Sequence, residues 1–323
     1  MVADFPADSR RPGRGRFAPS PTGSLHFGSL VAALGSFLEA RRWDSEWLVR
    51  IEDVDVSRAV PGAADAILRA LERCELFWDG PVLYQSQRTE AYRAALERLS
   101  SAELAYPCTC SRRELAMNPR GSDGGPIYPG HCRAGVRQPD RPRAIRLRTT
   151  DAPLAFRDAV QGEFRQCLAS EVGDFVVRRA DGLFAYQLAV VVDDADQGVT
   201  QVVRGSDLLD STPRQIYLQR LLGLPTPEYA HLPVAVDGRG NKLSKQTGAT
   251  PLDLRDPAPA LWIALRFLGQ SPPPDLRWEL ASTILAWARI HWRLERVPAT
   301  LSRRWEPSLP DPYRMNRIGT PVP

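Results

Sequence analysis

The sequence predicts an α/β fold in which a parallel sheet carries helices on both faces, with an insertion and a short C-terminal helical appendage. The main observation is a rhythm of short apolar runs, typical of buried strands, that alternate with stretches of helical periodicity. That rhythm stops over residues 105–185, which hold a cysteine cluster and a glycine-rich segment, and then returns. The length of 323 residues suits two domains, or one such domain with an insertion.

The first half of the predicted sheet domain, residues 15–104, opens with a short strand, RFAP, that ends in a Pro-Ser-Pro-Thr-Gly turn. A helix is expected next, because apolar residues recur at i, i+4, i+7 and i+8 from Leu30 and arginines occupy the last turn. The expected elements are a strand from Arg16, a helix over 28–42, a strand over 47–53, and helices over 61–75 and 87–100.

The second half, residues 186–250, is expected to resume the sheet. Its valine-rich segments YQLAVVVDD (186–194) and VTQVVRG (199–205) are predicted as strands, and Thr212-Pro213 is predicted to open a helix that ends at Leu222. In the appendage, residues 251–323, we expect helices over 258–268 and 276–291 and an irregular tail beyond 297. Residues 1–14 have the composition of a disordered leader.

Composition argues against a membrane-spanning or secreted chain. No apolar run approaches the roughly 20 residues that cross a bilayer, and no apolar stretch follows the basic N-terminus as in a secretory signal. A cytoplasmic location without a membrane partner is therefore expected. The net charge of +4 is compatible with a nucleic-acid partner without requiring one. Lysine occurs only at Lys242 and Lys245.

Two loops have the composition of a phosphate-binding site. RFAPSPTGSLHFGS (16–29) joins a strand to a helix, where glycines admit a ligand close to the backbone and the helix N-terminus attracts anions. It matches neither the P-loop nor the dinucleotide-binding pattern. GNKLSKQTGA (240–249) carries two lysines that can neutralise a triphosphate and a departing pyrophosphate without a general base. Taken singly, the first loop is better explained as a proline-rich turn with a hydrogen-bonded histidine, and the second as a solvated basic loop.

Three of the five cysteines, Cys108, Cys110 and Cys132, form a cluster in the sequence. In a cytosolic protein such clustering favours a metal over disulfides, and three thiolates suit a structural Zn²⁺ that needs a fourth ligand. His131 is the first chemical choice, although its neighbour Cys132 already ligates. The alternative is a set of reduced thiols without metal. We expect the remaining cysteines to be packing residues; these are Cys74 and Cys167.

A series of motifs, in order, resembles those of class I aminoacyl-tRNA synthetases. HFGS (26–29) is similar to the HIGH signature and KLSKQ (242–246) to the KMSKS loop. Four further segments resemble the glutamate branch of that class: RFAPSPTG, RIEDVDVSR, YQLAVVVDD and VVRGSDLL. The resemblance covers about residues 16–250. It implies a Rossmann-type catalytic domain, split by an acceptor-binding-like insertion, that activates L-glutamate with ATP and Mg²⁺.

For ATP, the resemblance implies that His26 and Ser29 at the helix start contact the phosphates and that Gly28 lies against the adenine. It implies Lys245 as the main triphosphate contact, with Lys242 assisting. No carboxylate is assigned to the magnesium ion.

For L-glutamate, the resemblance implies a pocket that holds a carboxylate and the α-ammonium group. Arg16 and Arg204 would hold a carboxylate, Glu52 would accept the α-ammonium and Tyr186 would donate a hydrogen bond. The end of the first strand would line the same pocket, with Phe17, Ala18, Pro19 and Ser20. In the alternative reading, Glu52 and Arg204 form a structural ion pair.

The family pattern C-x-C…Y-x-x-x-C implies Tyr128 as the fourth zinc ligand, and we favour it over His131. Only about 75 residues follow the KLSKQ loop, too few for the anticodon-binding region of a full glutamyl-tRNA synthetase. The resemblance is therefore closest to the truncated glutamyl-queuosine branch. That branch activates glutamate without tRNA and transfers it to queuosine in the anticodon loop of tRNA(Asp).

Two other functions remain open from the sequence. One is an ordinary glutamyl-tRNA synthetase that charges the tRNA 3′ end. The other is a catalytically silent paralogue that binds RNA, although the intact His26, Lys242 and Lys245 argue against silence. For the preferred function, a monomer is expected.

Overall fold

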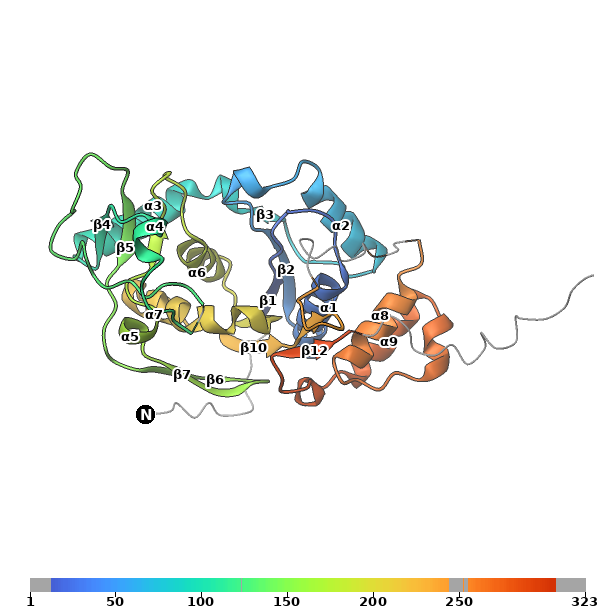
Figure 1. Cartoon of the computed structure of the whole chain (residues 1–323). Coiled ribbons are helices and arrows are strands. Elements are labelled where there is room, and N and C mark those ends of the chain that lie inside the picture. The colour runs from blue at the N-terminus through green and yellow to red at the C-terminus, as the bar shows by residue number, and fades with distance from the viewer. Residues whose placement is uncertain (1–12, 123, 244–251, 253–254, 306–323) are drawn as a thin grey trace, which may run out of the picture.

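The computed structural model describes residues 13–122, 124–243, 252 and 255–305, and its centre is built from parallel strands, as the alternating pattern predicts (Figure 1). One sheet consists of the parallel strands β1 (Arg14–Phe17), β2 (Glu46–Ile51) and β3 (Leu83–Tyr84). A second has the order β7 (Gly162–Gln166), β6 (Leu154–Asp158), β10 (Glu228–Leu232) and β9 (Gln201–Gly205), with β7 antiparallel to its neighbour and the others parallel.

The two sheets meet where β9 lies beside β1. The Thr200 N–H donates to the Arg14 carbonyl at 3.0 Å, just before β9 begins. Of the predicted leader 1–14, residues 1–12 lie outside the described residues, and β1 already begins at Arg14. All the strand ends that concern the site therefore belong to one continuous scaffold.

The predicted helices of the sheet domain are confirmed. They are α1 (Phe27–Arg42), α2 (Ala63–Arg73), α3 (Thr89–Ser101) and α7 (Thr212–Leu222), the last with proline in its first turn as expected. Short 3₁₀ turns lie between them at Val56–Arg58, Gln85–Gln87 and Ser206–Ser211.

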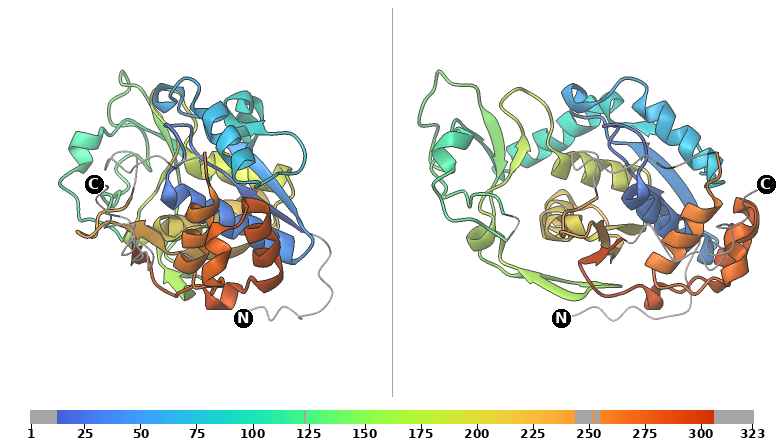
Figure 2. Two further views of the ribbon diagram at one scale, coloured as in Figure 1. Left: turned by 90° about the vertical axis from the view of Figure 1, so that its right-hand side faces the viewer. Right: turned by 45° about the vertical axis from the view of Figure 1, so that its right-hand side comes forward.

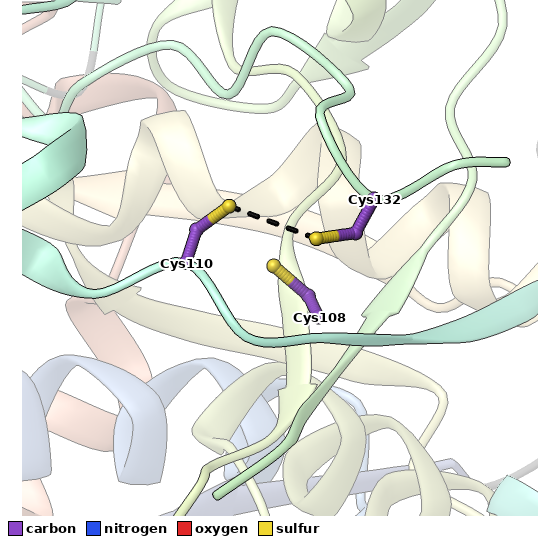
Figure 3. Close-up of side chains that lie close together, drawn as sticks. All are labelled: Cys108, Cys110 and Cys132. Carbon is purple, nitrogen blue, oxygen red and sulfur yellow. Dashed lines mark hydrogen bonds between the residues drawn. The ribbon is translucent and has the colours of Figure 1, made fainter. Parts of the chain in front are cut away.

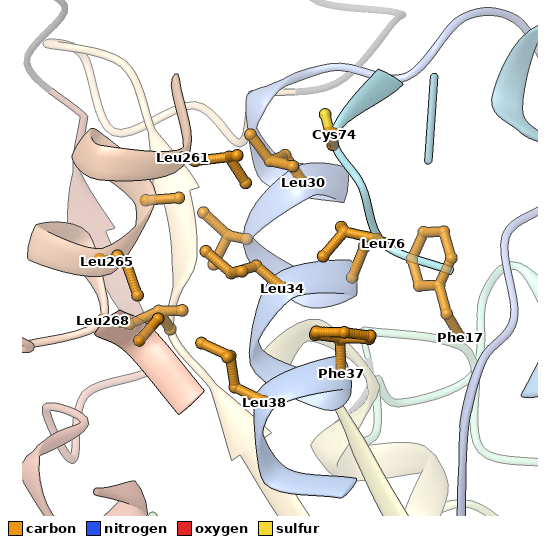
Figure 4. Close-up of a cluster of buried hydrophobic side chains, with 14 of the residues drawn as sticks. Phe17, Leu30, Leu34, Phe37, Leu38, Cys74, Leu76, Leu261, Leu265 and Leu268 are labelled. Carbon is orange, nitrogen blue, oxygen red and sulfur yellow. The ribbon is translucent and has the colours of Figure 1, made fainter. Parts of the chain in front are cut away.

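Helix α1 is the centre of the main hydrophobic core (Figure 4). Leu30, Leu34 and Leu38 are spaced at i, i+4 and i+8, so they share one face, and each is fully buried. In Figure 4 they meet leucines of α8 (Ala258–Phe267), a helix of the appendage. Helix α1 also approaches strand β10 closely at Gly35, where a Cβ would lie 2.5 Å from the Leu232 side chain. The core thus fixes α1 against the sheet.

The prediction of a strand over 186–194 is wrong, because this segment belongs to helix α6 (Tyr186–Asp196). Every residue from Leu188 to Asp194 is buried, and a continuous apolar run does not distinguish a buried strand from a buried helix. The preference of valine for strands is overridden by packing. The helix matters for the site. Along its axis, Tyr186 and Asp194 are about 12 Å apart, whereas in a strand they would be about 26 Å apart.

Residues 105–185 form an antiparallel unit and a hairpin that returns to the sheet (Figure 2). The unit consists of β4 (Ala105–Cys108), β5 (Ala144–Leu147) and β8 (Val176–Arg178), with the short helices α4 (Arg112–Leu115) and α5 (Leu168–Glu171). Strand β5 lies within the arginine-rich segment RAIRLR (143–148). The β6–β7 hairpin comes from the same stretch of sequence but pairs with β10. It therefore connects the insertion to the central scaffold.

The appendage packs its helices α8 and α9 (Ala281–His291) against α1 (Figure 1). The second helix starts later than predicted, because Pro274–Trp278 forms a separate 3₁₀ turn. The prediction of an irregular tail is wrong for β12 (Ser302–Arg304), which pairs in parallel with β11 (Val234–Val236). All three residues of β12 are exposed, so no hydrophobic pattern marked it. None of the helices in the described part of the chain is both long enough and apolar enough to span a bilayer.

We predict that Leu34→Ala lowers the free energy of unfolding by about 2–5 kcal/mol, because it opens a cavity in a core that packs on both sides of α1. Urea denaturation measures the loss. The matched control is Leu280→Ala, at a leucine that is 73% exposed, where the same deletion should have little effect. Equal losses in the two variants would contradict this description of the core.

Candidate active site

A cavity of about 740 Å³ opens at the carboxyl ends of strands β1, β2, β9 and β10. In parallel sheets this edge is where ligands bind, because loops and helix N-termini meet there. The lining residues include most of those predicted from the sequence: Phe17, Ala18, Pro19, Ser20, His26, Gly28, Ser29, Glu52, Tyr186 and Lys242. The fold thus brings the two halves of the predicted site into one cleft.

His26 occupies the N-cap of α1. Its Nδ1 accepts the backbone N–H of Ser29 at 3.2 Å, and its Nε2 lies 3.2 Å from the Ser29 hydroxyl. Gly28 lies close to both His26 and Leu243. A Cβ at this position would be 3.3 Å from the His26 imidazole and 3.4 Å from the Leu243 carbonyl oxygen. The helix start, with its partial positive charge, therefore lies directly against the beginning of the KLSKQ loop.

Of the two predicted lysines, Lys242 lies at the cavity and forms an ion pair with Asp207 at 2.5 Å. Asp207 follows β9, so this pair connects the KLSKQ loop to the strand that carries Arg204. Lys245 lies outside the described residues, as does the rest of the loop from position 244.

A network of buried charges lies beneath the cavity. Arg16 on β1 and Arg50 on β2 both donate to the same oxygen of Asp194 on α6, at 3.2 Å and 2.6 Å. Burial opposes ionisation of Asp194, but these two guanidinium groups hold the pKa of its carboxyl below the usual range. Arg16 uses only its Nε here, and within the described residues no hydrogen bond engages its Nη atoms. Arg16 is 3% exposed and, unlike its neighbour Phe17, is not among the residues that line the cavity.

Glu52, directly after β2, carries a carboxylate oxygen that is buried without a hydrogen-bond partner among the described residues. Burial raises the pKa of Glu52 to about 7, against the opposing charges of Arg50 and Arg16. Its ion pair is with Arg50, at 3.7 Å, and not with Arg204 as in the alternative reading. An unsatisfied buried acceptor at a cavity wall is suited to a cationic group of a ligand.

Arg204 is 5% exposed and lies beside Tyr186. Its Nη1 is 3.4 Å from the Tyr186 hydroxyl, whereas its Nε and Nη2 donate to His231 and Thr212 at 3.0 Å and 2.9 Å. Burial raises the pKa of Tyr186, so the phenol keeps its proton and can act as a donor. Arg204 therefore presents one end of its guanidinium group toward the Tyr186 side of the site.

The three clustered cysteines converge in the insertion, as predicted (Figure 3). Their sulfur atoms lie within 4.8 Å of one another, and Cys110 and Cys132 are 3.7 Å apart. A tetrahedral Zn²⁺ with Zn–S bonds of about 2.3 Å needs sulfurs about 3.8 Å apart, so the donor set fits this ion. Burial opposes ionisation of Cys132, yet backbone hydrogen bonds from Thr109 and Arg137 lower the pKa of its thiol to about 6.

Tyr128 faces the same cluster, whereas His131 is exposed. The Tyr128 oxygen is 3.3 Å from the Cys108 sulfur, 3.9 Å from the Cys110 sulfur and accepts the Cys132 N–H at 2.9 Å. Gly173 makes this possible: its φ is +74°, and a Cβ there would lie 2.4 Å from the Tyr128 carbonyl oxygen. The geometry thus favours Tyr128 over His131 as the fourth donor.

Comparison with known proteins identifies the family of this chain. Residues 14–270 match the family model for the catalytic domain of class I tRNA synthetases for E and Q. A glutamyl-Q tRNA(Asp) synthetase from Dechloromonas aromatica is 59% identical over 289 residues, which cover 89% of this chain and 96% of the relative. Another glutamyl-Q tRNA(Asp) synthetase, from Thiobacillus denitrificans, is 56% identical over 284 residues, which cover 88% of this chain and 94% of the relative. The chain belongs to the glutamyl-Q tRNA(Asp) synthetase family.

The fold of this family member is also that of a solved glutamate-tRNA synthetase. The crystal structure from Elizabethkingia anophelis superimposes with a TM-score of 0.77 at 24% identity. The match covers 92% of this chain and 68% of that one. The class I catalytic fold and its parallel sheet are thereby established for this chain.

Sequence reasoning missed the residues that hold the predicted arginines in place: Arg50, Asp158, Asp194 and His231. One signal was present for Arg50, because a charged residue in the middle of a buried strand requires a buried partner. Nothing local identified that partner, which lies 144 positions further along the chain.

We predict that Glu52→Gln changes the pH dependence of stability. Between pH about 4.5 and about 7 the folded chain keeps a proton on Glu52 that the unfolded chain has released, so this group lowers stability as the pH rises. The free energy of unfolding of the variant, minus that of the wild type, should therefore rise by about 3 kcal/mol from pH 4.5 to 7.5. Urea denaturation at a series of pH values tests this, and a constant difference would contradict it.

Proposed function

We propose that this protein activates L-glutamate with ATP, independently of tRNA, and transfers the glutamyl group to queuosine in the anticodon loop of tRNA(Asp). The observation that carries the proposal is the 59% identity with a glutamyl-Q tRNA(Asp) synthetase across 96% of that relative. In the first step an α-carboxylate oxygen of glutamate attacks the α-phosphorus of ATP, and pyrophosphate leaves.

The buried charges of the cleft support glutamate as the amino acid. In this proposal Arg16 and Arg204 hold the side-chain carboxylate, and Tyr186 donates to it. Glu52 accepts the α-ammonium through Oε1, which lies 3.7 Å from Arg50 and has no hydrogen-bond partner among the described residues. Because two cations face the far end of the substrate, glutamine should be rejected for lack of a charge. The strand end from Phe17 to Ser20 lines the same cavity.

The start of α1 supports ATP as the second substrate. His26 and Ser29 would contact the phosphates, and Gly28 leaves room for the adenine ring because it lacks a Cβ. Lys242 and Lys245 would neutralise the triphosphate and the departing pyrophosphate, which requires no general base. Mg²⁺ would accompany ATP. Lys242 would have to exchange its ion pair with Asp207 for the nucleotide.

The cysteine cluster is proposed to hold a structural Zn²⁺ through Cys108, Cys110, Tyr128 and Cys132. Such an ion contributes folding free energy to a small unit whose own core is limited. The proposed enzyme acts in the cytoplasm and as a monomer.

The acceptor is tested by transfer of radiolabelled glutamate to tRNA(Asp) with and without queuosine. We expect labelling only of the queuosine-containing tRNA, and the labelling should persist when the 3′-terminal nucleotide of the tRNA has been removed. Labelling that requires the 3′ ribose and ignores queuosine would instead identify an ordinary glutamyl-tRNA synthetase. Glutamate-dependent exchange of pyrophosphate into ATP without tRNA would exclude a silent RNA-binding paralogue.

Arg16→Ala is expected to abolish glutamate-dependent pyrophosphate exchange, because removal of a charged partner from a desolvated pair costs roughly 2–5 kcal/mol. The fold should persist, since Asp194 keeps Arg50 at 2.6 Å. Arg165→Ala, at an exposed arginine of β7, is the control and should exchange normally. Unchanged exchange in Arg16→Ala would remove this residue from the site.

Freshly purified protein should contain one zinc ion per chain, bound by the cysteine cluster. Elemental analysis of Cys110→Ser should show loss of the metal together with a lower melting temperature. Cys167→Ser, at a cysteine outside the cluster, should keep the metal and the melting temperature of the wild type. Wild-type protein without zinc, or equal metal content in both variants, would contradict the assignment.

A further inference from the structure

Next to Arg204 lies a buried pair of side chains, Asp158 and His231. Asp158, the last residue of β6, and His231 on β10 are both fully buried, and the His231 Nδ1 is 2.5 Å from an Asp158 carboxylate oxygen. On its other side, His231 accepts the Nε–H of Arg204 at 3.0 Å through Nε2. A chain of hydrogen bonds therefore runs from the hairpin of the insertion to the arginine of the amino-acid site.

The protonation state of His231 decides which of its two ring nitrogens donates a hydrogen bond and which accepts one. Burial, together with the positive charges of Arg204 and Arg16, lowers the pKa of His231 to about 4, although Asp158 opposes the shift. The imidazole is neutral at physiological pH and carries its single proton on Nδ1, facing the Asp158 carboxylate. Nε2 then has a lone pair, which is what the Nε–H of Arg204 requires.

The hairpin fixes Asp158 itself. Its Oδ1 accepts three backbone N–H groups, those of Val160, Gln161 and His231, at 3.0, 2.8 and 3.1 Å. Its Oδ2 is thereby left for the imidazole. Gln161 adds a further bond from the hairpin, from its side-chain amide to the His231 carbonyl at 2.7 Å. The turn that ends β6 thus holds the carboxylate in one orientation.

We propose that Asp158 and His231 are positioning residues, which fix the plane of the Arg204 guanidinium group so that its Nη1 faces the substrate beside Tyr186. The proposal rests on the proposed function of Arg204 in glutamate binding. Thr212 completes the arrangement by accepting from Nη2. With Nε and Nη2 both held, only one orientation of the guanidinium group satisfies all of its partners, so less freedom is lost when glutamate binds.

The sharpest variant is Asp158→Asn, which is nearly isosteric. The three backbone N–H groups require an acceptor, so the amide oxygen replaces Oδ1 and the NH₂ group faces His231. The imidazole must then carry its proton on Nε2, where it opposes the Nε–H of Arg204. The KM for glutamate in pyrophosphate exchange should rise about tenfold to hundredfold, with the KM for ATP within about twofold of the wild type.

A double-mutant cycle separates positioning from a general structural role. In an Arg204→Lys background the side chain has no Nε–H for His231, so Asp158→Asn should add less than about twofold to the KM for glutamate. His291→Gln, at an exposed histidine of α9, is the control and should leave both KM values unchanged. Circular dichroism verifies folding, and His231→Gln replaces Asp158→Asn in the same cycle if the latter does not fold.

Three results would overturn the proposal: an unchanged KM for glutamate, equal increases in the KM for glutamate and ATP, or full additivity with Arg204→Lys. The failure of the proposed function is distinguishable from all three. In that case the wild-type protein itself would show no glutamate-dependent exchange.

Discussion

Asp194 joins two buried arginines that come from neighbouring strands, and the rest of the cleft depends on this contact. Removing one member of a buried ion network costs about 3–5 kcal/mol, because the remaining charge is left in a poorly solvated place. Arg16 and Arg50 are thus held at the ends of β1 and β2 by a helix from the second half of the domain. The register of these elements is therefore coupled to the geometry of the site.

The network leaves the cleft with an excess of positive charge that a ligand can neutralise. Three arginines, Arg16, Arg50 and Arg204, face two carboxylates, and one of these, Glu52, keeps its proton up to a pH of about 7. An amino acid with two carboxylates and one ammonium group complements this arrangement. In the proposed binding mode the side-chain carboxylate would face Arg16 and Arg204 and the ammonium group would face Glu52, on side chains that the protein holds in place before binding.

Much of this could be predicted from the sequence, because local patterns carry it. The helix of α1 follows from its apolar spacing, and the cleft residues follow from motifs at strand ends. The prediction of a strand over 186–194 was wrong. Because seven consecutive residues are buried, no alternation of buried and exposed positions distinguishes a helix from a strand there. The partners of the arginines were missed for a different reason. Asp194 is 178 positions from Arg16, and Asp158 is 73 from His231, so only the fold brings these groups together.

The most direct test of the central claim is a crystal structure with L-glutamate and a non-hydrolysable ATP analogue. The account predicts the side-chain carboxylate of glutamate within hydrogen-bond distance of Arg16, Arg204 and Tyr186, with its ammonium group on Glu52 and the phosphates at the start of α1. Glutamate bound elsewhere, or turned so that its ammonium group faces the arginines, would contradict it.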